Sequence, residues 1–182
     1  MPEIPILGIT QETIAEVEQR LLTTTDTGEL DDIARFTRGV NRRLAQEQPV
    51  LGNFLRTSGT RFSINDVFPF AYAAALTYEM IPQPLKTEPL NQDHTESAFR
   101  SMLEHVTPTT DLTNTLKIRL DWFVDDMRAD SPDFMNWLEE TSASLDEKDD
   151  QADFILGSAI VITPFFKREQ SKRLEKLLWK EN

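Results

Sequence analysis

"VFPFAYAAALTYEMI", residues 67–81, is the stretch that decides the fold. Read as a helix, it carries apolar side chains on nearly every side. A helix of this kind is buried at the centre of a bundle, because it has no polar face to turn toward water. We therefore expect residues 67–81 to form the central helix, with Pro69 in its first turns or at a kink.

A second apolar run extends from Phe154 to Phe166 and has the features of a partner for that central helix. It is shorter than the roughly 18 residues that a membrane-spanning helix needs, so it predicts a buried core helix. Proline inside a helix removes a hydrogen bond and clashes with the preceding turn. We therefore expect two helices that meet at Pro164, a core helix followed by a basic amphipathic one.

Amphipathic helices are expected around this pair, because apolar residues recur with helical spacing along most of the chain. The clearest stripe is Ile14, Val17 and Leu21. Further stripes follow the same spacing: Ile33, Phe36, Val40 and Leu44; Val50, Leu51, Phe54 and Leu55; Phe99, Met102, Leu103 and Val106; Leu112, Leu116, Leu120, Phe123 and Met127. The prediction is an all-α fold, a compact bundle of about eight to nine helices without significant β-sheet.

Capping residues and prolines indicate where several of the predicted helices begin. Asp26 with Glu29, and Ser63 with Asp66, have the spacing of capping boxes. Pro49 suits a first helical turn, and Ser131 followed by proline suits an N-cap. We expect "DEKDD", residues 146–150, to be an exposed acidic loop.

The segment "PQPLKTEPLNQ", residues 82–92, is the best candidate for a boundary, because it has three prolines and no periodicity. Two interpretations remain open. The chain is a single helical domain over 1–182, or two helical halves, 1–81 and 93–182, joined by this connection.

The charge of the chain is strongly acidic, with a formal net value of −12. Such a surface repels nucleic acid and anionic membranes on average. The acidity, with scarce lysine and abundant threonine, fits a moderately halophilic source and an ordinary acidic protein equally well. The absence of cysteine and of a secretory signal favours a cytoplasmic protein, or one within a particle assembled inside the cell.

The sequence gives little support for a catalytic or metal-binding site. His94 and His105 would lie roughly 16 Å apart along one helix and cannot share a metal ion. Asp121, Asp125 and Asp126 are weak candidates for a divalent cation, and a solvated helix face is the simpler interpretation. No glycine-rich phosphate loop or nucleophile motif is present. We expect no enzyme activity, no cofactor and no metal, and a metal-dependent hydrolase around the three aspartates remains an alternative.

Two basic regions stand out against this acidity. Residues 167–182 carry six Lys or Arg and three Glu, whereas residues 1–166 carry 13 Lys or Arg and 28 Asp or Glu. The candidate partner-binding residues lie at the C-terminal end of the chain: Phe166, Lys167, Lys172, Arg173, Leu174, Lys176, Leu177, Leu178, Trp179 and Lys180. A second patch consists of Arg35, Arg38, Arg42 and Arg43.

The leading hypothesis is a non-catalytic helical module for protein–protein interaction or assembly, acting as an adaptor or a structural subunit, including a virion or connector component. A protein partner or self-association is expected, and no transmembrane segment. The alternative is a nucleic-acid-associated regulator that uses the arginine patch and the basic C-terminal tail, although the net charge disfavours it. The open question is whether that tail contacts its own acidic body or a neighbour's.

Overall fold

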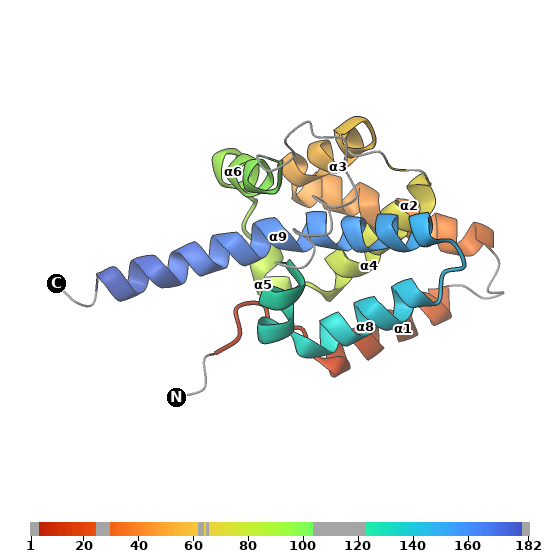
Figure 1. Cartoon of the computed structure of the whole chain (residues 1–182), viewed down its shortest axis with the longest axis horizontal. Coiled ribbons are helices and arrows are strands. Elements are labelled where there is room, and N and C mark those ends of the chain that lie inside the picture. The colour runs from red at the N-terminus through yellow and green to blue at the C-terminus, as the bar shows by residue number, and fades with distance from the viewer. Residues whose placement is uncertain (1–3, 25–29, 62–63, 65, 104–122, 180–182) are drawn as a thin grey trace.

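Helices α4 (Val67–Met80) and α9 (Lys148–Leu178) form the centre of the molecule (Figure 1). In this computed structural model we describe residues 4–24, 30–61, 64, 66–103 and 123–179. Almost every residue of α4 after Phe68 is buried, as its all-round apolar pattern predicts. The prediction of an all-α bundle is confirmed, and the described residues contain no strand.

The two central helices cross at a glycine. A Cβ added to Gly157 of α9 would overlap the backbone carbonyl oxygen of Phe70 on α4 and lie 3.3 Å from the Cβ of Ala73. The hydroxyl groups of Thr77 and Ser158 are 2.9 Å apart and form a hydrogen bond across the same interface. The absence of a side chain at Gly157 therefore sets how closely the backbones approach.

Helix α9 runs without interruption through Pro164, so the expected pair of helices meeting at that residue is wrong. The residues on both sides of Pro164 are buried, and packing against the rest of the core holds them in one helix. The Thr163 hydroxyl donates to the Ala159 carbonyl at 2.6 Å, one turn earlier. Tertiary packing has overridden the local cost of the proline.

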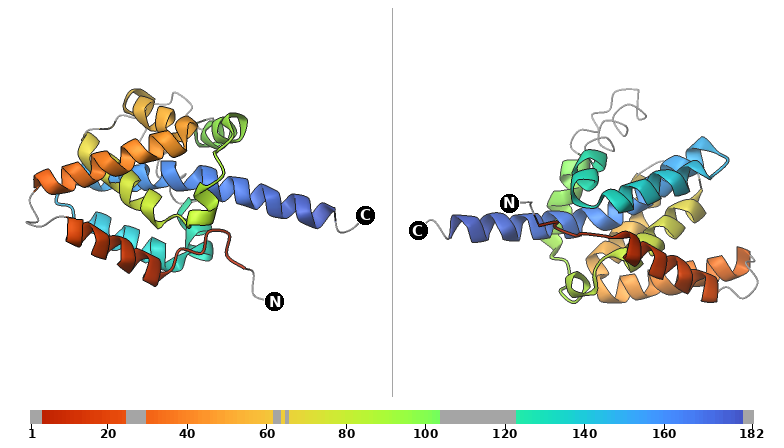
Figure 2. Two further views of the ribbon diagram at one scale, coloured as in Figure 1. Left: turned by 180° about the vertical axis from the view of Figure 1, so that it is seen from behind. Right: turned by 90° about the horizontal axis from the view of Figure 1, so that it is seen from below.

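Two further layers enclose the central pair (Figures 1 and 2). Helices α1 (Gln11–Thr24) and α8 (Pro132–Ala143) lie on one side. Helices α2 (Leu30–Glu47), α3 (Pro49–Arg61) and α6 (Gln92–Leu103) lie on the other. As predicted, Pro49 opens α3.

Ion pairs tie two outer helices to the centre. The buried Glu79 carboxylate of α4 accepts from Arg20 of α1 at 3.1 Å and also from Arg43 of α2. The Tyr78 hydroxyl donates to Glu47 at the end of α2. Glu79 is therefore a shared anchor for α1 and α2 on α4.

Two predicted helix ends differ from the structure. Asp66 itself is the N-cap of α4 and accepts from the Phe68 amide, whereas Ser63 lies outside the described residues. The expected acidic loop over 146–150 is only partly a loop, because α9 already begins at Lys148. Acidic residues favour a helix N-terminus, which explains how this segment can join the helix. Asp26 and Glu29 also lie outside the described residues.

Buried polar side chains hold the connection 82–92, which contains the short helix α5 (Gln83–Lys86). The Gln48 amide donates to the Lys86 carbonyl at 2.8 Å and accepts from the Leu90 amide at 2.7 Å. The Lys86 ammonium donates to the Tyr78 carbonyl at 3.1 Å. A single apolar cluster contains residues from both sides of this connection.

An N-terminal strap, residues 4–10, runs across the start of α8. The Asp130 carboxylate accepts from the backbone amides of Ile6, Leu7 and Gly8, and the Ser131 hydroxyl accepts from that of Ile9. Ser131 is the N-cap of α8, as predicted, but its side chain serves the strap rather than its own helix. Residues 123–130 before it are also helical.

Candidate functional site

The C-terminal end of α9 projects beyond the body of the molecule as a single helix (Figure 1). We call residues 174–179 the projection. Four of its side chains are large, apolar and between 57% and 80% exposed: Leu174, Leu177, Leu178 and Trp179. Water is a poor environment for a continuous apolar surface, and such surfaces mark binding sites.

The residues just before the projection are docked on the chain's own body. Phe166 is buried, and Lys167 lies 3.8 Å from Asp126 with its ammonium 5.7 Å from the centre of the Phe166 ring. Burial lowers the pKa of Lys167, and the Asp126 carboxylate acts in the opposite direction. Of the predicted partner-binding residues, these two thus contact the body itself.

Arg168 is almost completely buried, which is unusual for an arginine. Its guanidinium donates to the Glu88 carbonyl at 2.8 Å and the Leu85 carbonyl at 2.6 Å, and it pairs with Glu169 at 2.8 Å. One turn later Lys172 donates to the Glu88 carboxylate, which lowers the pKa of Glu88 and raises that of Lys172. The two cations therefore fix α9 to α5 and to the connection that follows it.

Arg173 contacts the N-terminal strap. Its guanidinium donates to the carbonyl groups of Ile4 and Pro5 in the N-terminal strap. The sequence left open whether the basic C-terminal tail contacts its own body or a neighbour, and the structure divides the tail into two parts. Residues 166–173 contact the chain's own body, whereas the projection extends past it.

The projection has an apolar side of defined direction. At about 100° per residue, Leu174, Leu177 and Leu178 fall within an arc of about 100°. Lys172, which faces Glu88, points about 160° away from Leu174 by the same geometry. Lys176, also in the projection, is exposed. Lys180 lies outside the described residues.

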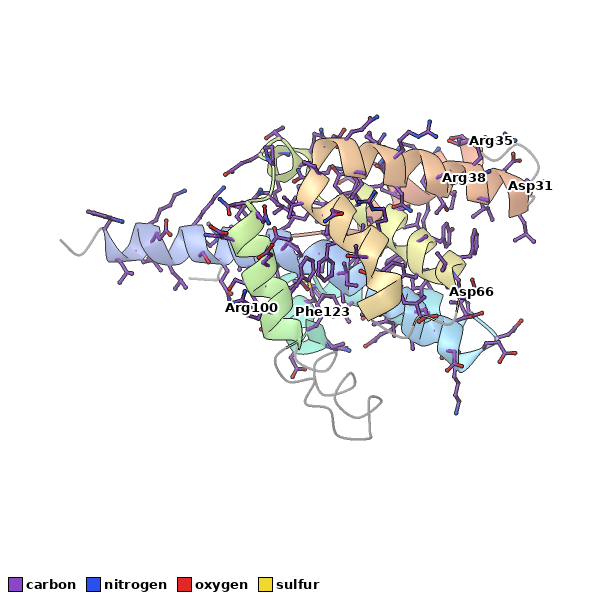
Figure 3. All side chains as sticks on the ribbon, turned by 90° about the horizontal axis from the view of Figure 1, so that it is seen from above. Asp31, Arg35, Arg38, Asp66, Arg100 and Phe123 are labelled. Carbon is purple, nitrogen blue, oxygen red and sulfur yellow. The ribbon has the colours of Figure 1, made fainter. Side chains whose placement is uncertain are left out.

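The arginine patch on α2 is partly used within the fold (Figure 3). Arg35 pairs with Asp32 at 3.1 Å, and Arg43 pairs with Glu79. Arg38 and Arg42 are exposed, and among the described residues no ion pair joins them to an acid. Arg38 and Arg42 are therefore the two arginines of the patch that the described fold does not use in an ion pair.

The candidate metal ligands do not come together in the described structure. Asp125 is exposed, Asp126 faces Lys167, and Asp121 lies outside the described residues. His94 is exposed on α6, and His105 is also outside the described residues. Among the residues that are described, no group of three or more potential ligands could hold a metal ion.

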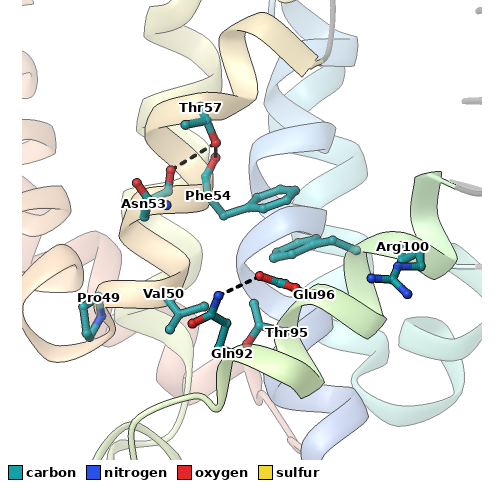
Figure 4. Close-up of a pocket in the computed structure, with 10 residues that line it drawn as sticks. Pro49, Val50, Asn53, Phe54, Thr57, Gln92, Thr95, Glu96 and Arg100 are labelled. Carbon is teal, nitrogen blue, oxygen red and sulfur yellow. Dashed lines mark hydrogen bonds between the residues drawn. The ribbon is translucent and has the colours of Figure 1, made fainter.

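A groove of about 550 Å³ lies between α3 and α6 (Figure 4). The rings of Phe54 and Phe99 stack at its base, with centroids 3.4 Å apart. Its sides are polar, and Gln92 donates to the Glu96 carboxylate at 2.8 Å. The lining contains no histidine and no serine beside a base, so it offers binding space rather than a recognisable reactive group.

No family model, curated protein or solved structure matches this chain. None of the helices described combines the length and the apolarity that a membrane crossing requires. Sequence reasoning included the apolar residues of the projection but could not separate them from the docked residues 166–173, because the boundary depends on contacts with segments that are distant in the sequence.

Proposed function

We propose that this chain is a non-catalytic assembly module that binds a protein partner through the projection of α9. The supporting observation is the exposure of Leu174, Leu177, Leu178 and Trp179 on a helix that extends beyond its own body. Tryptophan and apolar side chains at a protruding position are typical anchors of protein interfaces. The proposal covers an adaptor or a structural subunit, in the cytoplasm or in a particle assembled there.

The helix itself supports this role. Short isolated helices are unstable in water, but the projection continues a 31-residue helix whose middle part is buried. Nucleation has therefore already occurred, and the projection is presented in helical form. A preformed helix loses little conformational entropy on binding, which favours helix-in-groove recognition.

Two truncations test the proposal, because the structure places the boundary between the docked and projecting parts after Arg173. Deletion of residues 174–182 should leave the thermal midpoint and the circular dichroism unchanged while abolishing partner binding. Deletion of residues 167–182 should lower the midpoint as well, since it removes the contacts of Arg168 and Lys172.

Point variants refine the test. Leu174→Asp should abolish binding without unfolding the chain, whereas Asn136→Asp, which adds the same charge to an exposed position on α8, should not. Binding is measured by light scattering after size exclusion and by cross-linking in the cells that make the protein. A strictly monomeric chain with no partner that depends on residues 174–182 would contradict the proposal.

A further inference from the structure

A cavity of about 380 Å³ lies between α2, α3 and α4, which are neighbours in the bundle (Figure 1). Buried apolar side chains form its floor: Leu44, Phe70 and Ala74. Its mouth lies at Val67, which is 66% exposed, and at Arg56, which is also exposed. Sites for small molecules have volumes of about 300–1,000 Å³ and mostly apolar linings, so this cavity has the size and the character of a ligand site.

Contacts between the helices hold the walls of the cavity in place. Gly52 of α3 lies so close to α2 that an added Cβ would be 2.6 Å from the Cα of Ala45. The Asn41 amide of α2 donates to the Ala71 carbonyl of α4 at 3.0 Å. All four residues line the cavity. The space between the helices is therefore preformed, and a ligand that fits it needs little reorganisation of the protein.

Arg56 is the only charged residue among the described residues that line the cavity. Its guanidinium donates to the side-chain oxygen of Asn53 at 2.8 Å, and no ion pair joins it to an acid in the described part of the chain. A guanidinium carries several N–H donors in a planar fork that matches the two oxygens of a carboxylate. Arg56 can therefore receive an anionic group at the mouth.

The chain around the cavity also favours an anion. Residues 33–65, which include most of α2 and all of α3, contain six Arg, no Lys and a single Glu, in a chain whose formal net charge is −12. Arg35 and Arg43 are engaged in ion pairs within the fold. The acids that lie next along the chain, Glu47 and Asp66, do not line the cavity. A local excess of positive charge attracts anionic ligands to an otherwise acidic surface.

We infer that this cavity binds a small amphipathic monocarboxylate, an organic acid with an aliphatic or aromatic body. Its carboxylate would lie on Arg56 and its body on the apolar floor. The single cation of the lining matches a single negative charge. The groove between α3 and α6 is larger, but it is lined by both Glu96 and Arg100, so its charges select no ligand class. The inference is independent of the projection, which contributes no residue to the cavity.

Three probes separate the two parts of the site: octanoate, octan-1-ol, which lacks the carboxylate, and acetate, which lacks the apolar body. Isothermal titration calorimetry at about 150 mM salt, where distant charges are screened, should show saturable one-to-one binding of octanoate, weaker binding of octanol and none of acetate. Each CH₂ group that is buried strengthens binding by up to about fourfold. The affinity should therefore rise from hexanoate to octanoate.

A charge variant tests the role of Arg56. Arg56→Gln should weaken octanoate binding about two- to tenfold and leave octanol binding unchanged, because only the contact with the carboxylate is lost. Arg38→Gln is the matched control, since Arg38 is an exposed arginine of α2 that does not line the cavity. The control should bind octanoate as the wild-type chain does.

A filling variant tests the location of the apolar body. Ala71→Leu places a larger side chain in the cavity and should abolish the binding of both octanoate and octanol. Ala15→Leu makes the same change at an exposed position of α1 and should leave both affinities unchanged. Circular dichroism checks that each variant folds. If Ala71→Leu does not fold, Val67→Trp at the exposed mouth takes its place.

Three results would overturn the inference. The first is the absence of saturable octanoate binding to the wild-type chain. The second is octanoate binding by the filled variant as strong as in wild type, which would place the ligand elsewhere. The third is an equal effect of Arg56→Gln on octanoate and octanol, which would show that the site does not recognise the carboxylate.

Discussion

Individual residues set the distances between the helices of this bundle. Gly157 permits the α4–α9 crossing, and Gly52 does the same between α3 and α2, where an added Cβ would lie 2.6 Å from the Cα of Ala45. Gly39 on α2 has open space around it. Gly157 and Gly52 thus share a role that Gly39 lacks, and the sequence alone does not distinguish them because the contacting atoms belong to other helices.

A pair of glycine substitutions tests this distinction. Gly157→Ala should lower the free energy of unfolding by about 1–3 kcal/mol, because the methyl group overlaps a backbone carbonyl and the helices must separate. Gly39→Ala should raise it by about 0.5–1 kcal/mol through helix propensity alone. Urea denaturation measures both, and equal effects of the two variants would argue against the close crossing.

Lys86 is a second residue whose role is visible only in the fold. It is buried beside the Tyr78 ring, with its ammonium 4.9 Å from the ring centre, and its electrostatic neighbours are Arg43, Glu47 and Arg20. Burial, followed by the charge of Arg43, lowers the pKa of Lys86 to about 8 from 10.5. The folded protein therefore releases this proton at a lower pH than the unfolded chain does.

The lowered pKa predicts a rise in stability with pH. Between about pH 8 and 10.5 the unfolded chain binds more protons at this lysine, so the free energy of unfolding increases over that window. Below pH 8 the lysine is protonated in both the folded and the unfolded state, and burial of its charge lowers the free energy of unfolding by the full amount. Lys86→Met should remove about 1–3 kcal/mol of this rise, measured by urea denaturation from pH 7 to 10. Lys148→Met, at an exposed lysine, is the control and should keep the rise.

Among the elements, the N-terminal strap shows most clearly what the sequence could not reveal. Asp130 and its three backbone donors are more than 120 residues apart along the chain. No periodicity or capping pattern relates positions so distant. By contrast, the N-cap position of Ser131 and the burial of most of 69–81 follow patterns of neighbouring residues, and both were predicted.

Removal of the Asp130 carboxylate should release the strap. Asp130→Ala should lower the free energy of unfolding by about 1.5–3 kcal/mol, since hydrogen bonds to a charged group are lost. It should also expose the strap to proteases, because its amides lose their acceptor. Limited proteolysis followed by mass spectrometry detects cleavage there, and Asp125→Ala, at an exposed acid, is the control. Unchanged protease resistance would contradict the strap's dependence on Asp130.

Helix α9 is the element on which prediction failed in part. The apolar run from Phe154 to Phe166 was correctly placed in the core. Pro164 suggested a break because proline removes one backbone hydrogen bond of a helix. In the folded protein, the packing of the buried residues around Pro164 outweighs that loss. The boundary after Arg173 also escaped prediction, because it depends on where the strap and the α5–α6 connection end in space.

At the scale of the whole molecule, α9 links the buried centre to the projecting C-terminal end. Over 31 residues α9 spans about 45 Å, with Asp149 and Asp150 in its first turn and Lys176 beside Glu175 in its last. This order agrees with the helix dipole, which favours acids at the N-terminus and bases at the C-terminus. The sequence showed the charge asymmetry as a difference between two stretches of chain, but only the fold shows that Arg168, Lys172 and Arg173 of the basic stretch contact the body.

The late position of α9 in the chain also has a consequence for synthesis. Helix α4 ends at Met80 and its main partner begins at Lys148, so 67 residues separate them. At translation rates of about 5–20 residues per second, the most apolar helix leaves the ribosome about 3–13 s before its partner starts to emerge. During that interval its surface is available to chaperones and to neighbouring nascent chains, and the core closes only when α9 arrives.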